Sequence, residues 1–189
     1  LGGGTGVLFR NSITTTKVTD AESQSFEYSE WSIRVGTKRL KLIIIYRPPD
    51  SVNHPVSTAV FFTEFSSFIE SAVLCTDRLL ISGDFNIHAN IYGDVDAAKL
   101  QDLFQSVGLV QHVRCPIHIG GHTLDLIVTL QSDKLIETSP IAGYLFFDHS
   151  PVLCQLQVGR PSWKKSRVSH SNKKSINLDA LREDLFNWN

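Results

Sequence analysis

The sequence contains no methionine and only three cysteines among its 189 residues. Cys75, Cys115 and Cys154 are far apart and odd in number, so they provide neither a paired CxxC metal knuckle nor a complete disulfide framework. We therefore expect a reducing, intracellular location, in the nucleus or the cytoplasm. The chain starts at Leu1, after which an initiator methionine is not ordinarily trimmed, so we interpret it as a piece of a longer protein.

Long apolar runs are also absent. The longest one, residues 42–46, is far short of the roughly 20 residues that a membrane-spanning helix requires. No positively charged segment followed by an apolar stretch opens the chain, as a secretion signal would. We therefore expect no membrane association.

An excess of charge of one sign is absent from the chain as a whole, because 18 Lys and Arg residues stand against 19 Asp and Glu residues. This balance excludes a uniformly basic coat for nucleic acid. Positive charge is concentrated in residues 160–174, which hold six Lys or Arg residues and no acidic residue. There Trp163 could stack on a base while Lys164, Lys165 and Arg167 contact phosphates. A solvated linker is the alternative interpretation.

The hydrophobic content of 42% and the length fit one globular domain. We place this domain at residues 1–158, a basic linker at 159–177 and the start of a following helix at 178–189. Asn177 is positioned to cap that last helix. No sequence motif indicates an obligate protein partner.

Hydrophobic periodicity predicts a layered α/β domain with substantial antiparallel pairing. Strands are predicted at 7–9, 31–35, 40–46, 79–81, 124–128 and 152–158, and helices at 61–73 and 100–107. The strand at 40–46 has two apolar faces, so we expect it at the centre of a sheet that is covered on both sides. Gly83 is predicted to end the strand at 79–81, and Asp94 or Asp96 to cap the second helix.

Three short segments place acidic or imidazole groups where a strand gives way to a loop: 83–86 (GDFN), 123–125 (TLD) and 148–150 (DHS). Strand ends that meet at one edge of a sheet can hold such groups together on rigid supports. Taken singly, each segment has an ordinary explanation. Asp84 is typical of a turn, Asp125 could bond a backbone amide, and His149 could cap a loop.

The order of five segments resembles the endonuclease domain of non-LTR, LINE-type retrotransposons. These segments are GGGTGVLFR, IIIYRPP, LLISGDFNIH, GHTLDLIVT and DHSPV. That domain belongs to the endonuclease/exonuclease/phosphatase superfamily, with the apurinic endonucleases and pancreatic deoxyribonuclease. The resemblance covers residues 1 to about 158, and it implies a DNase I-like α/β sandwich of two mostly antiparallel or mixed sheets flanked by helices. The tail resembles the linker that leads to a reverse transcriptase.

The resemblance implies a role for each matched residue of the reaction centre. Asp84 would align or deprotonate the attacking water, and Asn86 would hold this water or a phosphate oxygen. Tyr46 would contact the scissile phosphate. Asp125 would orient His149, whose imidazole would stabilise the charge that develops on the phosphate.

The resemblance also implies a metal and DNA contacts. Asp148 would lie with Asp84 on the metal side of the site, where the cation would be Mg²⁺ or Mn²⁺, and Arg47 and Thr123 would contact nucleic acid. In the family, two strands that carry an Asn and the principal metal-binding Glu precede the glycine-rich segment. Because this chain begins at that segment, we expect a domain that is incomplete at its N terminus and binds the metal weakly.

The function implied by the resemblance is Mg²⁺-dependent nicking of target DNA, which leaves a 3′-hydroxyl for reverse transcription. A catalytically impaired remnant that acts as a binding or scaffold module, or a decayed element, is one alternative. A phosphatase of the same superfamily is another. Separately, the HxxC and HxxxH spacings of His112, Cys115, His118 and His122 could suggest zinc, and a polar loop is the other interpretation.

The catalytic hypothesis makes a geometric prediction. Asp84, Asn86, Asp125 and His149 should converge on one cleft, with Asp125 within hydrogen-bonding reach of His149 and Tyr46 at the rim. The cleft should lack a glutamate on its metal side. Sheet edges should lie open where the two preceding strands would pair.

Overall fold

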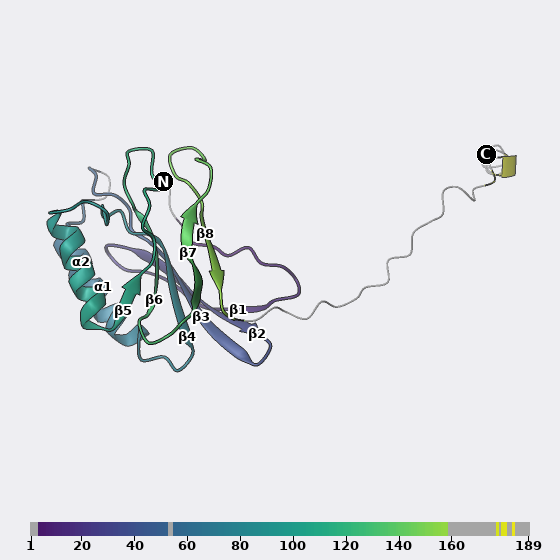
Figure 1. Cartoon of the computed structure of the whole chain (residues 1–189), viewed down its shortest axis with the longest axis horizontal. Coiled ribbons are helices and arrows are strands. Elements are labelled where there is room, and N and C mark those ends of the chain that lie inside the picture. Colours follow the sequence, from purple (N-terminus) through teal and green to yellow (C-terminus); the bar gives the residue numbers. More distant parts are fainter. Residues whose placement is uncertain (1–3, 53–54, 159–176, 178, 181–182, 184–189) are drawn as a thin grey trace.

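The computed structural model describes residues 4–52, 55–158, 177, 179–180 and 183 (Figure 1). Within residues 4–158 it contains eight strands and two α-helices. In chain order these are β1 (Thr14–Glu22), β2 (Glu27–Val35), β3 (Lys38–Tyr46), α1 (Thr58–Ala72), β4 (Arg78–Asp84), α2 (Val95–Ser106), β5 (Leu109–Gln111), β6 (Asp125–Leu130), β7 (Ile136–Ala142) and β8 (Val152–Leu156).

The strands form a six-stranded sheet in the order β1-β2-β3-β4-β6-β5 and a two-stranded sheet of β7 and β8. Every pair is antiparallel except β3 and β4, which are parallel and joined by α1. In Figure 1 both helices lie on one side of the large sheet and the β7–β8 pair lies on the other. The predicted layered α/β class with antiparallel pairing is therefore confirmed.

The first core lies between the large sheet and the two helices. Five buried phenylalanines form a network of edge-to-face and stacked rings in this core. The ring centre of Phe65 lies 5.7 Å from that of Phe26 and 5.6 Å from that of Phe85. Such tilted ring pairs stabilise a core beyond the area they bury. The apolar face of α1 that contributes to this core matches the predicted helical spacing: Phe61, Phe65, Ile69 and Ala72 are buried.

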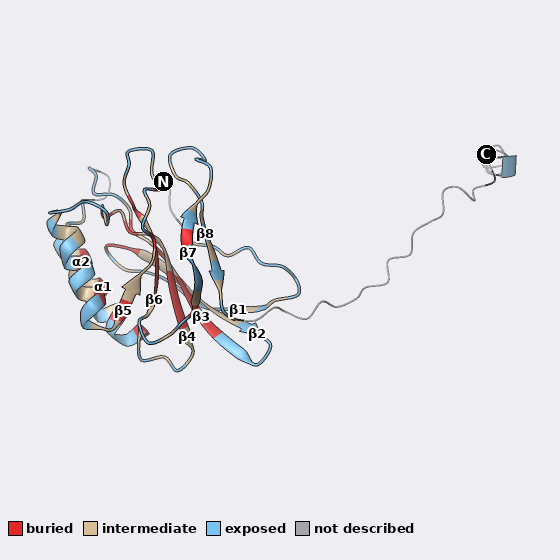
Figure 2. Ribbon diagram, viewed as in Figure 1, coloured by how far each residue is buried: buried red, intermediate tan, exposed pale blue. Residues whose placement is uncertain are grey.

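The second core lies between the large sheet and the β7–β8 pair. From the large sheet it contains Leu40, Leu42, Leu80 and Ile127, and residues of β7 and β8 pack against these. Strand β3 contributes to both cores, with Ile43 and Ile45 in the first and Leu40 and Leu42 in the second. Its predicted central position is confirmed, and Figure 2 shows buried residues concentrated on the middle strands.

Several predicted elements differ in the structure. Residues 7–9 are not a strand, and the sheet begins instead with β1, whose polar sequence TTTKVTDAE has no alternating apolar face to reveal it. Strands β5 and β7 were not predicted, because the first has three residues and the second has one buried position. We expected helices against both sheets. Among the described residues the two helices cover one face of the large sheet, and no helix covers the small sheet.

Gly83 does not end β4, which continues to Asp84. Its φ is +143°, and a Cβ at this position would lie 1.8 Å from the carbonyl oxygen of Ile45 on β3. A glycine is needed here because the two parallel strands approach too closely for any side chain. The residue therefore permits the close approach of β3 and β4 that brings their ends together.

The edges of the small sheet and the C-terminal segment complete the description. In the described part of the chain β7 and β8 pair only with each other, so each has one edge without a β partner. The Asn177 side chain accepts hydrogen bonds from the backbone N–H groups of Asp179 and Ala180, which confirms the predicted cap. The basic stretch with Trp163, Lys164, Lys165 and Arg167 lies outside the described residues. Among those that are described, none of the helices combines the length and apolarity needed to cross a bilayer.

Candidate active site

Three side chains of the candidate site come from neighbouring positions on adjacent strands. Tyr46 on β3 is paired with Asp84 on β4, and Asp84 is paired with Asp125 on β6. Directly paired positions direct their side chains to the same face of a sheet. The Leu80 and Ile127 positions of the same strands show that this face is the one toward β7 and β8.

Asn86 holds the Asp84 carboxylate in place. Its backbone N–H donates to Asp84 Oδ1 at 3.0 Å, and its side-chain Nδ2 donates to Asp84 Oδ2 at 3.2 Å and to the Arg47 carbonyl oxygen at 2.6 Å. Asn86 has a positive φ of 46°, a conformation that asparagine tolerates better than most residues. The tight turn that follows β4 therefore fixes the orientation of the carboxylate.

The buried Arg47 side chain stabilises this turn through hydrogen bonds to its backbone. Only 4% of the residue is exposed, and Nη1 donates to the carbonyl oxygens of Phe85 at 3.2 Å and Asn86 at 2.8 Å. Nη2 donates to Thr58 Oγ1 at 3.0 Å, and the guanidinium lies 4.9 Å from the centre of the Phe61 ring. Arg47 was expected to contact nucleic acid, but it is enclosed by protein and its donors are used there.

Thr123 is also enclosed by protein. It is 1% exposed, its hydroxyl donates to the Cys115 carbonyl oxygen at 2.8 Å, and its N–H donates to Asn90 Oδ1 at 2.8 Å. The expected contact with nucleic acid is not compatible with this position. Thr123 instead anchors the segment that leads into β6 and so helps to place Asp125.

His149 lies in the loop between β7 and β8, and its Nδ1 is 2.6 Å from Asp125 Oδ2. Burial lowers the pKa of His149, but the hydrogen bond and the negative charges of Asp125, Asp84 and Asp148 outweigh it, so the pKa is raised. The imidazole is therefore held toward its charged form. Asp84, Asn86, Asp125 and His149 thus converge as predicted, and Asp125 is within hydrogen-bonding reach of His149.

The site raises the pKa of two more groups. Burial raises the pKa of Asp84, and Asp125 adds to this, although the Asn86 N–H and the imidazoles of His149 and His118 act in the opposite direction. Burial followed by the charges of Asp84 and Glu27 raises the pKa of Tyr46. The Tyr46 phenol therefore stays protonated and can donate a hydrogen bond.

Two groups of side chains have ligand atoms close enough together for a metal ion, within 4.8 Å of one another. One consists of Asp84, Asp125 and His149, and the other consists of His118, Asp148 and His149. The carboxylate oxygens of the first group suit a hard divalent cation such as Mg²⁺. Asp84 and Asp148, which were expected to hold the metal together, fall into different groups.

Neither group contains a glutamate. The suggested zinc cluster does not form among the described residues. His112 Nε2 instead bonds Thr129 Oγ1 at 2.8 Å. His118 is the one member of that suggested cluster that reaches the site. The sequence predicts either a zinc ligand or a polar loop at His118 and no place in the site, because no spacing links it to the DHS segment.

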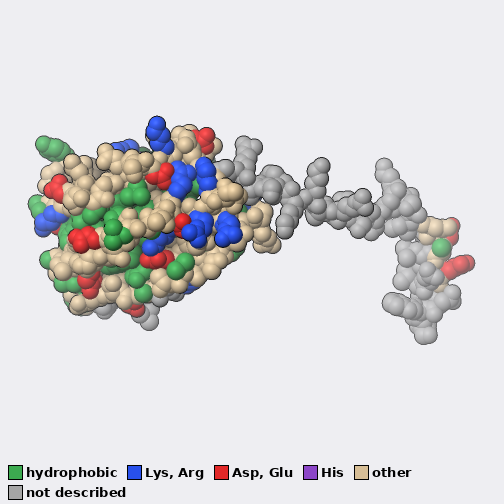
Figure 3. Space-filling model, turned by 90° about the horizontal axis from the view of Figure 1, so that it is seen from below, with side chains coloured by type: hydrophobic (Ala, Val, Ile, Leu, Met, Phe, Trp, Pro, Cys, Tyr) green, Lys and Arg blue, Asp and Glu red, His purple; other side chains and the backbone are tan. Residues whose placement is uncertain are grey.

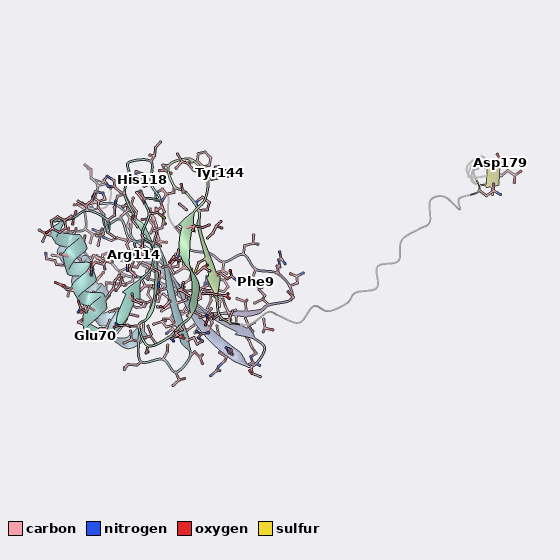
Figure 4. All side chains as sticks on the ribbon, in the orientation of Figure 1. Phe9, Glu70, Arg114, His118, Tyr144 and Asp179 are labelled. Atoms are coloured by element: carbon pink, nitrogen blue, oxygen red, sulfur yellow. The ribbon has the colours of Figure 1, made fainter. Side chains whose placement is uncertain are left out.

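A cavity of about 710 Å³ adjoins the site, and its walls include Gly83, Asp125, Tyr144, Phe146 and His149. Figure 4 shows His118 and Tyr144 at the same end of the molecule. Figure 3 views the molecule from below, where Lys and Arg side chains are interspersed with Asp and Glu and no histidine is visible.

The basic residues around one surface hollow of about 470 Å³ are Lys38, Arg39, Arg78 and Lys134. Arg78 is paired with Asp133 and Arg39 with Asp77. The charges of these two arginines are therefore largely compensated.

Several solved structures are similar to this chain. An endonuclease/exonuclease/phosphatase family protein from Leptotrichia buccalis is similar with a TM-score of 0.49 and 13% identity, over 78% of this chain and 61% of that one. A 3′ phosphatase, NExo, from Neisseria bound to a product DNA hairpin gives a TM-score of 0.49 and 17% identity, over 68% and 64%. TDP2 from D. rerio, complexed with a single-strand DNA product, gives a TM-score of 0.47 and 10% identity, over 74% of this chain and 67% of that one.

The chain spans about six-tenths of the length of the first two of these structures. No curated protein sequence matches it. A family model described as endonuclease-reverse transcriptase matches residues 40–153, which is more than half of the chain and includes Tyr46, Asp84, Asp125 and His149. The chain therefore belongs to the endonuclease-reverse transcriptase family.

Proposed function

We propose that this chain is the DNA endonuclease part of a LINE-type retroelement and hydrolyses phosphodiester bonds with the help of Mg²⁺. One observation carries the proposal. Asp84, Asn86, Asp125 and His149 come from three segments that are far apart in the sequence, yet they meet at one end of the sheets. An ordinary structural role for each residue would give them no reason to meet.

The electrostatics suit an anionic substrate that resists attack. A phosphodiester repels a nucleophile, so hydrolysis needs a base for the water and positive charge or hydrogen-bond donors for the phosphate. Asp84 is the proposed base, because its raised pKa brings it closer to the range in which a carboxylate accepts a proton effectively. Asn86 holds this carboxylate and lies beside the position that the water would occupy.

His149 and Tyr46 are the proposed contacts to the phosphate. Asp125 Oδ2 accepts a hydrogen bond from Nδ1–H of His149, which leaves Nε2 to donate to a phosphate oxygen when the ring is charged. The raised pKa of His149 favours that charged form. Tyr46, paired with Asp84 across the strands, adds a neutral donor at the rim.

Asp84 and Asp125 would hold a divalent cation, and Asp148 offers an exposed carboxylate near His149. Mg²⁺ bound there would neutralise negative charge on the phosphate. Because no glutamate joins either metal-capable group in the described residues, we expect weak binding of Mg²⁺. Mn²⁺ should serve as well, since carboxylate oxygens and water are suitable ligands for both ions.

The proposed product is a nick with a 3′-hydroxyl, which a reverse transcriptase domain joined to this one would extend. The test is incubation of the chain with supercoiled plasmid in Mg²⁺ or Mn²⁺, with EDTA as the control. We expect open-circular plasmid whose 3′ ends a DNA polymerase extends without further treatment. Release of phosphate from a 3′-phosphorylated oligonucleotide, without nicking, would favour a phosphatase. DNA binding without hydrolysis of either substrate would favour a non-catalytic module.

A further inference from the structure

His118 lies against the candidate site, although it belongs to none of the motifs that define it. Its ring centre is 5.0 Å from that of His149, and the two rings are inclined at 73°. The backbone joins the two segments, since Ile119 N–H donates to the Asp148 carbonyl oxygen at 2.8 Å and Ser150 N–H donates to the Ile117 carbonyl oxygen at 2.6 Å. The position of His118 beside His149 is therefore built into the fold.

The tautomer of His118 follows from one hydrogen bond. The backbone N–H of Gly120 points at His118 Nδ1, with 3.0 Å between the nitrogens. Because a backbone amide can only donate, Nδ1 must present its lone pair, and the proton of the neutral ring is then on Nε2. A metal bound at Nε2 would need the lone pair at that atom. The bond from Gly120 therefore makes His118 an N–H donor and not a metal ligand.

The surroundings hold the ring in this state. A Cβ on Gly120 would lie 3.0 Å from His118 Nδ1 and 3.2 Å from His122 Cδ2, so the turn has no room for a side chain that leaves the rings undisturbed. His122 in turn stacks on His88, with ring centres 4.0 Å apart. In the described part of the chain no residue forms a hydrogen bond with Nε2 of His118.

We propose that His118 is a further substrate-contacting residue, whose Nε2–H donates to a phosphate oxygen of the DNA next to the phosphate that His149 contacts. The proposal rests on the proposed function, because DNA is the ligand that brings phosphates to this site. Phosphate oxygens are acceptors only, so they match a donor fixed by its tautomer. The two imidazoles then supply two neighbouring donors along the same strand.

The first measurement is the tautomer itself. Long-range proton–nitrogen NMR on the full chain should show His118 protonated at Nε2 and not at Nδ1. Replacement of Gly120 by Ala should disturb the His118 signals, because the added methyl group meets the ring. A wild-type His118 protonated at Nδ1 would overturn the proposal.

The second measurement is binding of a nicked DNA duplex that carries a 5′-phosphate at the nick, compared with the same duplex without that phosphate. His118→Phe keeps the ring and removes the donor, whereas His118→Gln keeps an N–H donor at similar reach. We expect the Phe variant to lose about tenfold in affinity or more and the Gln variant to retain most of it, with similar melting temperatures. Equal losses in both variants, or no loss in either, would overturn the proposal.

Two outcomes separate this inference from the proposed function. If the wild-type chain fails to nick plasmid while His118→Phe still weakens binding of the nicked duplex, the catalytic proposal fails and the role of His118 stands. If the chain binds Zn²⁺ at one site per molecule and His118→Phe abolishes that binding, the group is a metal site and the inference is wrong.

Discussion

Nδ1 of His149 lies 2.6 Å from Oδ2 of Asp125, although the two residues belong to different layers of the protein. Asp125 begins β6 in the large sheet, and His149 lies in the loop that joins the two strands of the small sheet. This contact links the two sheets at the end where Asp84 and Tyr46 also lie. Its removal should therefore change both the protonation of His149 and the reaction.

Replacement of Asp125 by Asn should lower the pKa of His149. In the wild-type chain this pKa is raised above its unfolded value of about 6.5, so protonation of His149 stabilises the folded state. This contribution to the free energy of unfolding is complete below about pH 6.5 and is lost as the pH rises through the folded pKa. An NMR titration of His149 should show a midpoint above this value, and a lower midpoint in the variant. Identical midpoints would show that Asp125 does not govern the charge of His149.

Replacement of Asp84 by Asn should raise the melting temperature at neutral pH while abolishing nicking. The pKa of Asp84 is raised in the folded state, chiefly by burial. The folded protein therefore favours the protonated carboxyl, and stability falls as the pH rises from the unfolded pKa of about 3.9 through the folded pKa. The gain in melting temperature should shrink toward pH 4, near the pKa of Asp84 in the unfolded chain. Asp102→Asn on the exposed face of α2 is the control and should change the melting temperature little.

Replacement of Gly83 by Ala should destabilise the protein by about 3 kcal/mol or more, because the added methyl group meets the Ile45 carbonyl and the backbone has a positive φ. Gly36→Ala is the matched control. It also has a positive φ, of +63°, but no atom lies within 4 Å of the added Cβ. Gly36→Ala should lower the free energy of unfolding by about 1 kcal/mol. Equal losses of unfolding free energy in urea would contradict the close approach of β3 and β4.

Replacement of Arg47 by Lys should destabilise the protein by about 2 kcal/mol or more, since an ammonium group cannot reproduce the fork that bonds Phe85, Asn86 and Thr58. The salt dependence of DNA binding should not change, because Arg47 contacts no phosphate. Arg34→Lys on the exposed part of β2 serves as the control for stability. A shallower salt dependence with unchanged stability would place Arg47 on the DNA.

The sequence predicted those parts of the fold whose residues alternate or repeat. Strand β3 and helix α1 were recognised because nearly every buried position is apolar. Strand β1 could not be found in this way, since its pairing with β2 depends on backbone hydrogen bonds and not on an apolar face. Gly83 was assigned to a strand end because the sequence does not reveal which backbone approaches it.

The candidate site was predicted in part for a similar reason. The segments with Asp84, Asp125 and His149 were identified by their order along the chain, and the structure brings them together. Arg47 and Thr123 were expected to contact nucleic acid, yet both are buried by residues that lie elsewhere in the sequence. His118 reaches the site through backbone pairing with the 148–150 segment, which no local pattern encodes.

The most direct test of the central claim is the rate of metal-dependent plasmid nicking by the wild-type chain and by the variants Asp84→Ala and His149→Ala, with Arg34→Ala as the control. If these residues form the reaction centre, each of the two site variants should be slower by about 100-fold or more, because a base or a charge-stabilising donor is lost. Arg34→Ala should keep the wild-type rate. Nicking at the wild-type rate in both site variants would contradict the assignment of this site.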